Sequence, residues 1–200
     1  MPRIRLIFEK KGWITFVNHM DLPTLFSRAA RRAGLSQEFT QGFSPHPHIS
    51  LASPLAIGVE GLSEPAEFWF SEWNDGCLDS WNANLPDGLK FLKWAEVDGP
   101  ALAKLTTAAV YKFRGVGFDF DEHALQVLKE EVVHSGILFA ASLGDKVISL
   151  TVGGLERCGA GNMVRALAEN GVCRGWRDVR IVREIVGTWD QADQSVLPLI

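Results

Sequence analysis

The chain has 200 residues, of which 46% are hydrophobic and 22% are charged. These fractions are typical of soluble globular proteins and exclude disordered and fibrous classes. The first ten residues, MPRIRLIFEK, place charges where a signal peptide has its apolar run, and no apolar stretch reaches the roughly 18 residues that a membrane helix needs. We therefore expect a complete, soluble, cytoplasmic protein that has no membrane partner.

The net charge of −4 hides an asymmetry along the chain. Residues 1–50 carry seven Lys or Arg and three Asp or Glu, a net charge of +4, whereas the other 150 residues carry thirteen and twenty-one, a net charge of −8. A basic N-terminal segment that also holds three histidines favours an anionic partner, and the acidic remainder favours solubility.

The first elements follow from hydrophobic periodicity. Residues 3–9 alternate charged with apolar side chains, which predicts a half-buried strand. After a Lys-Lys-Gly turn, residues 13–17 either return as a short strand or lead into the next helix. Residues 21–34 have apolar side chains at helical spacing and end on a glycine, which predicts a helix whose other face carries three arginines.

Glycines and prolines break the segment 37–61 into loops and short extended pieces. A strand, a helix and a strand then follow at residues 67–73, 78–85 and 89–97. The order of elements up to Pro100 is therefore β-α-β-β-α-β, with the second strand inside the broken segment.

The same order returns after Gly99-Pro100. We predict extended, helical, paired extended, helical and extended segments at residues 106–117, 122–133, 137–141 with 147–152, 162–170 and 179–186. The fold class expected is α+β, with two ferredoxin-like (βαββαβ) halves packed side by side. The N-terminal half is 1–100 and the C-terminal half is 101–200.

Histidines and an aspartate in the N-terminal segment could carry chemistry. His19 and Asp21 stand at the entrance to the first helix, and His46 and His48 lie two residues apart on a loop braced by Gly and Pro. Imidazole titrates near neutral pH, so His19 and His46, with Asp21, are the candidate catalytic residues for acid–base cleavage of a phosphodiester. Alternatively, His19, His46 and His48 are candidate ligands of a single transition metal, although their spacing matches no standard site.

Binding without chemistry is a third interpretation. Arginines on the first helix can contact phosphates, while the aromatic residues at positions 13, 39 and 43 can stack on bases. The candidate substrate-binding residues are Lys10, Arg28, Arg31, Arg32, Gln41, Phe43, Ser44 and His48.

The N-terminal motifs are similar to those of a protein family. The matching positions are Arg5, Phe8, Lys10, Gly12, His19, Asp21, Leu22, Arg28 to Ala33, Gly42 to Pro47, Pro54, Leu55 and Gly58. This set resembles the DUF2344 family, also called the radical SAM-linked family, with Asn18 in place of a serine and Thr24 in place of an arginine. The resemblance implies an accessory role beside a separately encoded radical SAM protein, and it supplies no assigned reaction.

The cysteines exclude an iron–sulfur cluster on this chain. Cys77, Cys158 and Cys173 have neither CxxxCxxC nor CxxC spacing, so we expect reduced thiols and no cofactor of the chain's own. The twin-half order also resembles that of CRISPR repeat-processing endoribonucleases, a likeness of element order alone.

The leading hypothesis is an accessory module that works with a radical SAM enzyme. It binds RNA, such as tRNA, or another anionic substrate through the basic N-terminal segment, without DNA specificity and without catalysis of its own. The alternatives are an enzyme that uses the His/Asp site and a domain that serves only protein interaction.

Overall fold

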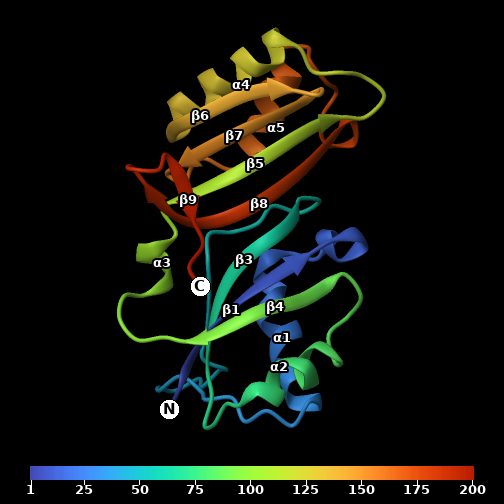
Figure 1. The fold of residues 1–200 in the computed structure, drawn as a ribbon. Coiled ribbons are helices and arrows are strands. Elements are labelled where there is room, and N and C mark those ends of the chain that lie inside the picture. Colours follow the sequence, from blue (N-terminus) through green and yellow to red (C-terminus); the bar gives the residue numbers. More distant parts are fainter.

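The computed structural model describes residues 1–200 and contains five α-helices and a nine-stranded sheet (Figure 1). The α+β class is confirmed. The first half consists of β1 (Arg3–Lys10), α1 (Leu22–Arg32), β2 (Ile49–Leu51), β3 (Glu60–Trp69), α2 (Asp75–Asn82) and β4 (Leu89–Glu96). Two short 3₁₀ helices, η1 (Gly12–Phe16) and η2 (His19–Asp21), connect β1 to α1.

The second half begins after a short helix, α3 (Leu102–Leu105), that the sequence did not predict. Its elements are β5 (Ala108–Gly115), α4 (Glu122–Ser135), β6 (Ile137–Gly144), β7 (Val147–Gly153), α5 (Ala160–Glu169), η3 (Trp176–Asp178), β8 (Val179–Asp190) and β9 (Ser195–Leu197).

Both halves contribute to one sheet, in the order β4-β1-β3-β8-β5-β7-β6. Each half has the β-α-β-β-α-β element order of a ferredoxin-like unit, and its neighbouring strands are antiparallel. The halves join where β3 and β8 run parallel, through the pairs Glu60–Val182 and Gly61–Arg183. The short strand β2 pairs only with the later part of β3, so the first part of that edge is open to β8. The division of the chain at residue 100 stays a prediction.

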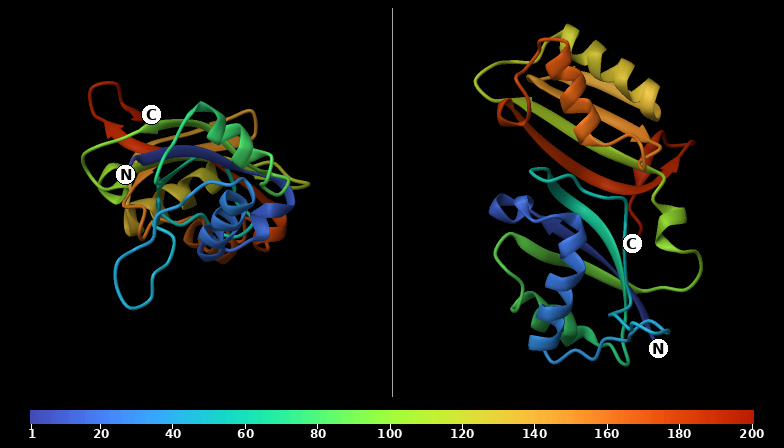
Figure 2. Two further views of the ribbon diagram at one scale, coloured as in Figure 1. Left: turned by 90° about the horizontal axis from the view of Figure 1, so that it is seen from below. Right: turned by 180° about the vertical axis from the view of Figure 1, so that it is seen from behind.

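Helices cover one face of the sheet, and α1 and α5 lie in front of the strands when the molecule is seen from behind (Figure 2, right). Beneath α1 and α2 is a core cluster of 13 buried residues that is rich in aromatic rings, in which the Trp81 indole N–H donates to the Phe26 carbonyl at 3.1 Å. The second cluster has 26 buried residues and lies under α4 and α5. It also includes Ala52, Leu55 and Val59, so the loop before β3 anchors the first half in the core of the second.

Several elements differ in detail from the sequence prediction. Residues 12–16 form η1 rather than a strand, because Gly12 turns the chain with a φ of 65° and the Thr15 hydroxyl donates to its carbonyl at 2.7 Å. The predicted helix 78–85 begins earlier, at Asp75, because the Asn74 side chain caps it by accepting the Gly76 N–H at 3.0 Å. The predicted strand 67–73 spans Glu60–Trp69, where it pairs with β1.

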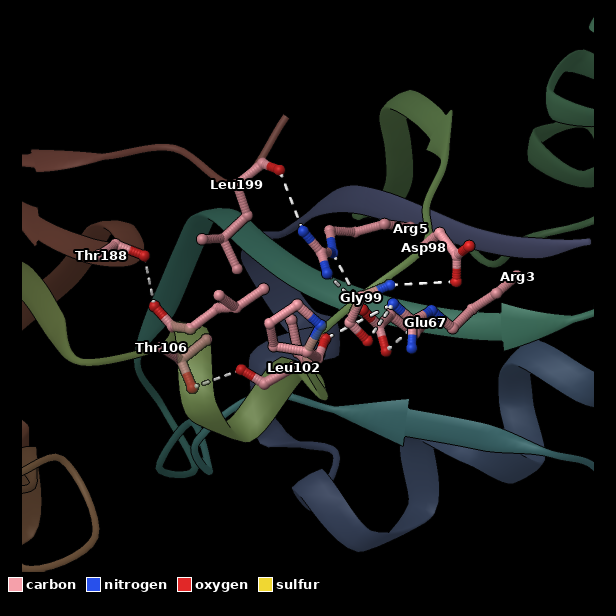
Figure 3. Close-up of polar contacts among 11 residues, drawn as sticks. Arg3, Arg5, Glu67, Asp98, Gly99, Leu102, Thr106, Thr188 and Leu199 are labelled. Atoms are coloured by element: carbon pink, nitrogen blue, oxygen red, sulfur yellow. Dashed lines mark hydrogen bonds and ion pairs between the residues drawn. The ribbon is translucent and has the colours of Figure 1, made fainter.

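The opposite face of the sheet holds a buried ion pair (Figure 3). The Arg5 guanidinium donates to Glu67 Oε1 at 2.6 and 3.0 Å, and a third donor of Arg5 reaches the Leu199 carbonyl at 3.2 Å. The Arg3 guanidinium donates to the Gly99 carbonyl at 3.1 Å. These contacts hold the C-terminal strand segment and the connection between the halves against β1. No helix in the structure combines the length and the apolar composition that crossing a membrane requires.

Candidate functional site

A network of charged side chains, here called the seam network, lies on the helix face where β3 meets β8. The Arg183 guanidinium is fully buried and makes a bidentate pair with Glu64, with Nε–Oε1 2.9 Å and Nη2–Oε2 2.6 Å. It also donates to the Tyr111 hydroxyl at 3.2 Å and to the carbonyls of Pro54 and Ser53 at 3.1 and 2.9 Å. One side chain therefore connects β8, β3, β5 and the loop before β3.

Strand periodicity explains how an arginine comes to be buried there. Val179, Ile181 and Arg183 alternate onto the same face of β8, and the first two belong to the core. Burial alone would lower the pKa of Arg183, but Glu64 and Tyr111 together raise it by more. Glycine is required at position 61, because a Cβ there would come within 2.6 Å of Glu64 Cγ.

Lys10 belongs to this buried region and not to a phosphate-binding surface. It follows Ile4, Leu6 and Phe8 on the core face of β1, and its side chain is fully buried. Its ammonium donates to the carbonyls of Val17 and Thr15 at 2.7 and 3.3 Å. Burial lowers the pKa of Lys10, the Glu64 carboxylate opposes that shift and Arg183 adds to it. The ammonium thus fastens η1 to the strand that precedes it.

His19 lies beside the seam network. Its Nδ1 accepts the Leu55 N–H at 3.4 Å. Burial, together with the positive charges of Arg183 and Lys10, lowers the pKa of His19 to about 4, so its imidazole is neutral at physiological pH. The same charges oppose the binding of a metal cation. Asp21 is exposed and makes no capping bond with its side chain.

The loop before β2 is a projecting hairpin, here called the motif hairpin, formed by residues 37–48. Backbone bonds close it from Thr40 N to the His46 carbonyl and from His48 N to the Glu38 carbonyl, both at 2.8 Å. It projects from the body of the molecule as the light blue loop of Figure 2, left. Its tip exposes three of the predicted binding residues, Gln41, Phe43 and Ser44.

The two histidines of the motif hairpin have different environments. His46 is exposed, and its Nδ1 lies 3.1 Å from the Thr40 hydroxyl. His48 stacks on Trp69 with ring centroids 3.6 Å apart and an angle of 3°, and the resulting burial, with His46 nearby, lowers its pKa. No three His, Cys, Asp or Glu side chains of the structure are grouped so that they could hold a metal ion. His19, His46 and His48 therefore do not form a ligand set in this conformation.

Arginines of α1 line a pocket of about 600 Å³ between that helix and the motif hairpin, here called the arginine pocket. Arg28 and Arg31 form no ion pair. Ser27 Oγ and Gln37 Nε2 are buried without a hydrogen-bond partner, and both residues line the pocket. Half-exposed Phe39 lines it from the hairpin. The pocket thus offers two cations and an aromatic ring, and two unsatisfied polar atoms are buried in its wall.

Arg32, the third predicted arginine, does not line the arginine pocket. Its Nη2 donates to the Asn84 carbonyl at 2.5 Å, which ties α1 to the end of α2. Asn18, which replaces the serine of the family pattern, accepts the Met20 N–H at 3.1 Å and so still caps η2.

Sequence reasoning missed the main members of the seam network, Glu64, Tyr111 and Arg183. A signal was present, because each occupies a core-facing position of its strand while carrying a polar group. The contacts themselves join residues up to 130 positions apart, which no local pattern reveals.

The chain matches the family described as "Uncharacterized protein conserved in bacteria (DUF2344)" over residues 3–138, a range that contains the motif hairpin and the arginine pocket. No curated protein matches it. Among solved structures, a crystal structure of an unknown protein from Galdieria sulphuraria is 10% identical, with 93% of this chain and 97% of that chain covered and a TM-score of 0.29.

Proposed function

The chain belongs to the DUF2344 family of conserved bacterial proteins, and we propose that it is an accessory module that binds RNA or another anionic substrate in the arginine pocket. In this proposal the module has no catalytic activity of its own and presents the bound molecule, such as a tRNA, to a separately encoded radical SAM enzyme.

The observation that carries the proposal is the unsatisfied state of the arginine pocket. A buried polar atom without a partner costs roughly 1–3 kcal/mol, and a ligand that supplies the missing bond removes that cost. Ser27 Oγ and the amide of Gln37 are buried in the wall of the pocket, and each would donate to a phosphate oxygen once its side chain turned toward the pocket. Arg28 and Arg31 add guanidinium groups, which bind phosphate in a bidentate manner.

The exposed residues of the motif hairpin favour RNA over a small anion as the ligand. Phe43 is fully exposed at the tip, and Phe39 is half-exposed beside the arginines. Proteins recognise unpaired RNA by stacking its bases on aromatic rings while cations contact the backbone. Gln41 and Ser44 at the tip offer hydrogen-bonding groups to base edges or riboses.

The choice of a radical SAM enzyme as the partner is based on the family resemblance and on the spacing of the cysteines. A radical SAM enzyme holds its cluster with closely spaced cysteines, and the three cysteines of this chain lie far apart in sequence without that motif. In this proposal, the radical SAM partner supplies the cluster.

Fluorescence anisotropy with labelled tRNA tests the proposal. We expect Arg28→Ala/Arg31→Ala to weaken binding by about 10-fold or more, since each charge-assisted bond contributes roughly 1.5–3 kcal/mol. The slope of log affinity against log salt should fall by about 1.4 to 1.8. Exposed arginines of the second half provide the matched control, Arg157→Ala/Arg165→Ala, which should leave both values unchanged. Equal binding by both double variants contradicts the proposal.

Gel analysis of the RNA after incubation separates the module from the enzyme alternative. Intact RNA supports a binding module. Cleavage by the wild-type chain that is lost in His19→Ala or His46→Ala would instead assign the acid–base role to those histidines.

A further inference from the structure

Exposed aromatic rings gather beside the joint between the halves, at a distance in sequence from the arginine pocket. Trp13 is 90% exposed and Phe16 is 63% exposed, both on η1, while Trp176 of η3 is 42% exposed. Two hollows of about 440 and 610 Å³ lie between these three rings. They adjoin each other, since Phe16 and Arg180 line both. An indole that remains in water forgoes the burial that usually stabilises it, so rings presented in this way mark an interaction surface.

Cations line the same surface. Arg180 and Arg177 border the larger hollow, and Arg180 also borders a third hollow of about 470 Å³ with Lys112 and Arg114. Arg114 and Arg180 form no ion pair. The third hollow contains the open-face side chains of β5 and β8, so the cations continue from the aromatic rings onto the sheet.

Four carboxylates border this surface, but none of them forms an ion pair with Arg114 or Arg180. Glu184 pairs with Lys112 at 2.7 Å, and Glu60 accepts the Gly12 N–H at 3.2 Å. Asp145 also lines the third hollow. Arg177 lies 3.8 Å from Asp178, a carboxylate whose closer bonds are to Arg174.

We propose that a single-stranded RNA segment binds across the joint between the halves, with its bases against Trp13, Phe16 and Trp176 and its phosphates at Arg177, Arg180 and Arg114. The ligand class rests on the proposed function, but the site does not, because it shares no residue with the arginine pocket. Arg180 borders all three hollows, so the surface is an elongated cationic path, and a path of that shape suits an extended polyanion better than a compact protein segment. The Trp13 and Phe16 rings are 6.3 Å apart and tilted by 37°, so each presents its own face to a base.

Fluorine NMR of protein labelled with fluorotryptophan tests this site directly. We expect a short oligouridine to shift the signals of Trp13 and Trp176 and to leave that of buried Trp81 unchanged. Arg114→Ala/Arg180→Ala should lower the salt slope by about 1.4. Trp13→Ala/Phe16→Ala should weaken oligouridine binding about 5- to 150-fold for each base that loses its stacking partner.

The controls separate this site from the arginine pocket. Arg28→Ala/Arg31→Ala should leave the Trp13 and Trp176 shifts intact, even if the proposed function fails. Saturating oligouridine without a shift at Trp13 or Trp176 overturns the inference. Equal shifts with polyglutamate overturn the RNA assignment and identify a surface for acidic protein segments instead.

Discussion

The seam network and the arginine pocket both contain arginines, yet Arg183 is fully buried and fully hydrogen-bonded, whereas Arg28 and Arg31 are exposed and unpaired. In the seam network, the Arg183 guanidinium donates hydrogen bonds to Glu64, Tyr111 and two backbone carbonyls. In the arginine pocket, Arg28 and Arg31 have no carboxylate, and two neighbouring polar atoms have no partner. A saturated charge holds elements together, whereas an unsaturated one is available to a ligand.

The basic residues of the N-terminal segment therefore fall into two groups: some stabilise the fold, and others are free to bind a ligand. Lys10 is buried in the interior, and Arg32 is hydrogen-bonded to the carbonyl after the end of α2, so neither adds to a binding surface. A count of charges along the sequence therefore overstates the number of cations that a ligand can meet.

The largest expected effect breaks the seam network. Arg183→Met should lower the free energy of unfolding by about 3–5 kcal/mol, because the Glu64 carboxylate is then buried without a counter-charge. Urea denaturation measures this change. Glu64→Met/Arg183→Met should recover part of the loss, and a double variant as unstable as the single one would show that the uncompensated charge is not the cause.

A pH dependence follows from His19 at the edge of the seam network. The unfolded chain has a His pKa of 6.5 and the folded chain one of about 4, so the unfolded state binds more protons between these values and stability falls as pH drops through that window. The loss is at most about 3–4 kcal/mol. His19→Asn should flatten the curve of urea midpoints between pH 6.5 and 4. His134→Asn, at an exposed helical position, should leave it unchanged; if both variants keep the wild-type slope, other groups control it.

A smaller effect on stability is expected at Ser27, which lines the arginine pocket. Ser27→Ala removes an unsatisfied hydroxyl and improves helix propensity, so it should raise the free energy of unfolding by about 1 kcal/mol while weakening tRNA binding. The matched variant is Ser80→Ala, whose hydroxyl donates to the Ala33 carbonyl at 3.2 Å. It should not stabilise the protein. A loss of stability in Ser27→Ala would show that the hydroxyl has a structural partner.

The smallest effect is expected at the arginines themselves. Arg28→Ala and Arg31→Ala should each change the free energy of unfolding by no more than about 0.5 kcal/mol, as exposed positions without partners do. Thermal unfolding of the same samples used for tRNA binding provides the check. A marked drop in melting temperature would place these side chains in the fold rather than in a binding site.

Local periodicity predicted most of the fold. The helix from Asp21 and the hairpin of β6 and β7 follow directly from apolar spacing and a glycine-containing turn. Residues 12–16 and β2 were harder, because a 3₁₀ turn and a three-residue strand are too short to show a period. The single sheet was not predicted, since its joint depends on how little of the β3 edge β2 covers.

The binding role of the candidate site residues stays a prediction, but the structure shows which of them share a pocket. Arg28 and Arg31 share a pocket with Phe39 and Pro47 of the motif hairpin, whereas the predicted residues at the tip of the hairpin do not line that pocket. Lys10 was assigned to substrate binding, yet its place after Ile4, Leu6 and Phe8 puts it on the core face. Applying strand alternation to charged residues as strictly as to apolar ones would have placed Lys10 and Arg183 inside the protein.

The joint between β3 and β8 also has a mechanical consequence. It has two paired positions, against eight between β5 and β8, so the side chains of the seam network, more than backbone hydrogen bonds, hold the two parts of the sheet together. Because few backbone hydrogen bonds cross the joint, we expect the backbone amides beside it to exchange with solvent before those in the rest of the sheet. A ligand that contacts both η1 of the first half and η3 of the second half would bridge the joint. We expect its binding to slow the hydrogen exchange of the backbone amides there.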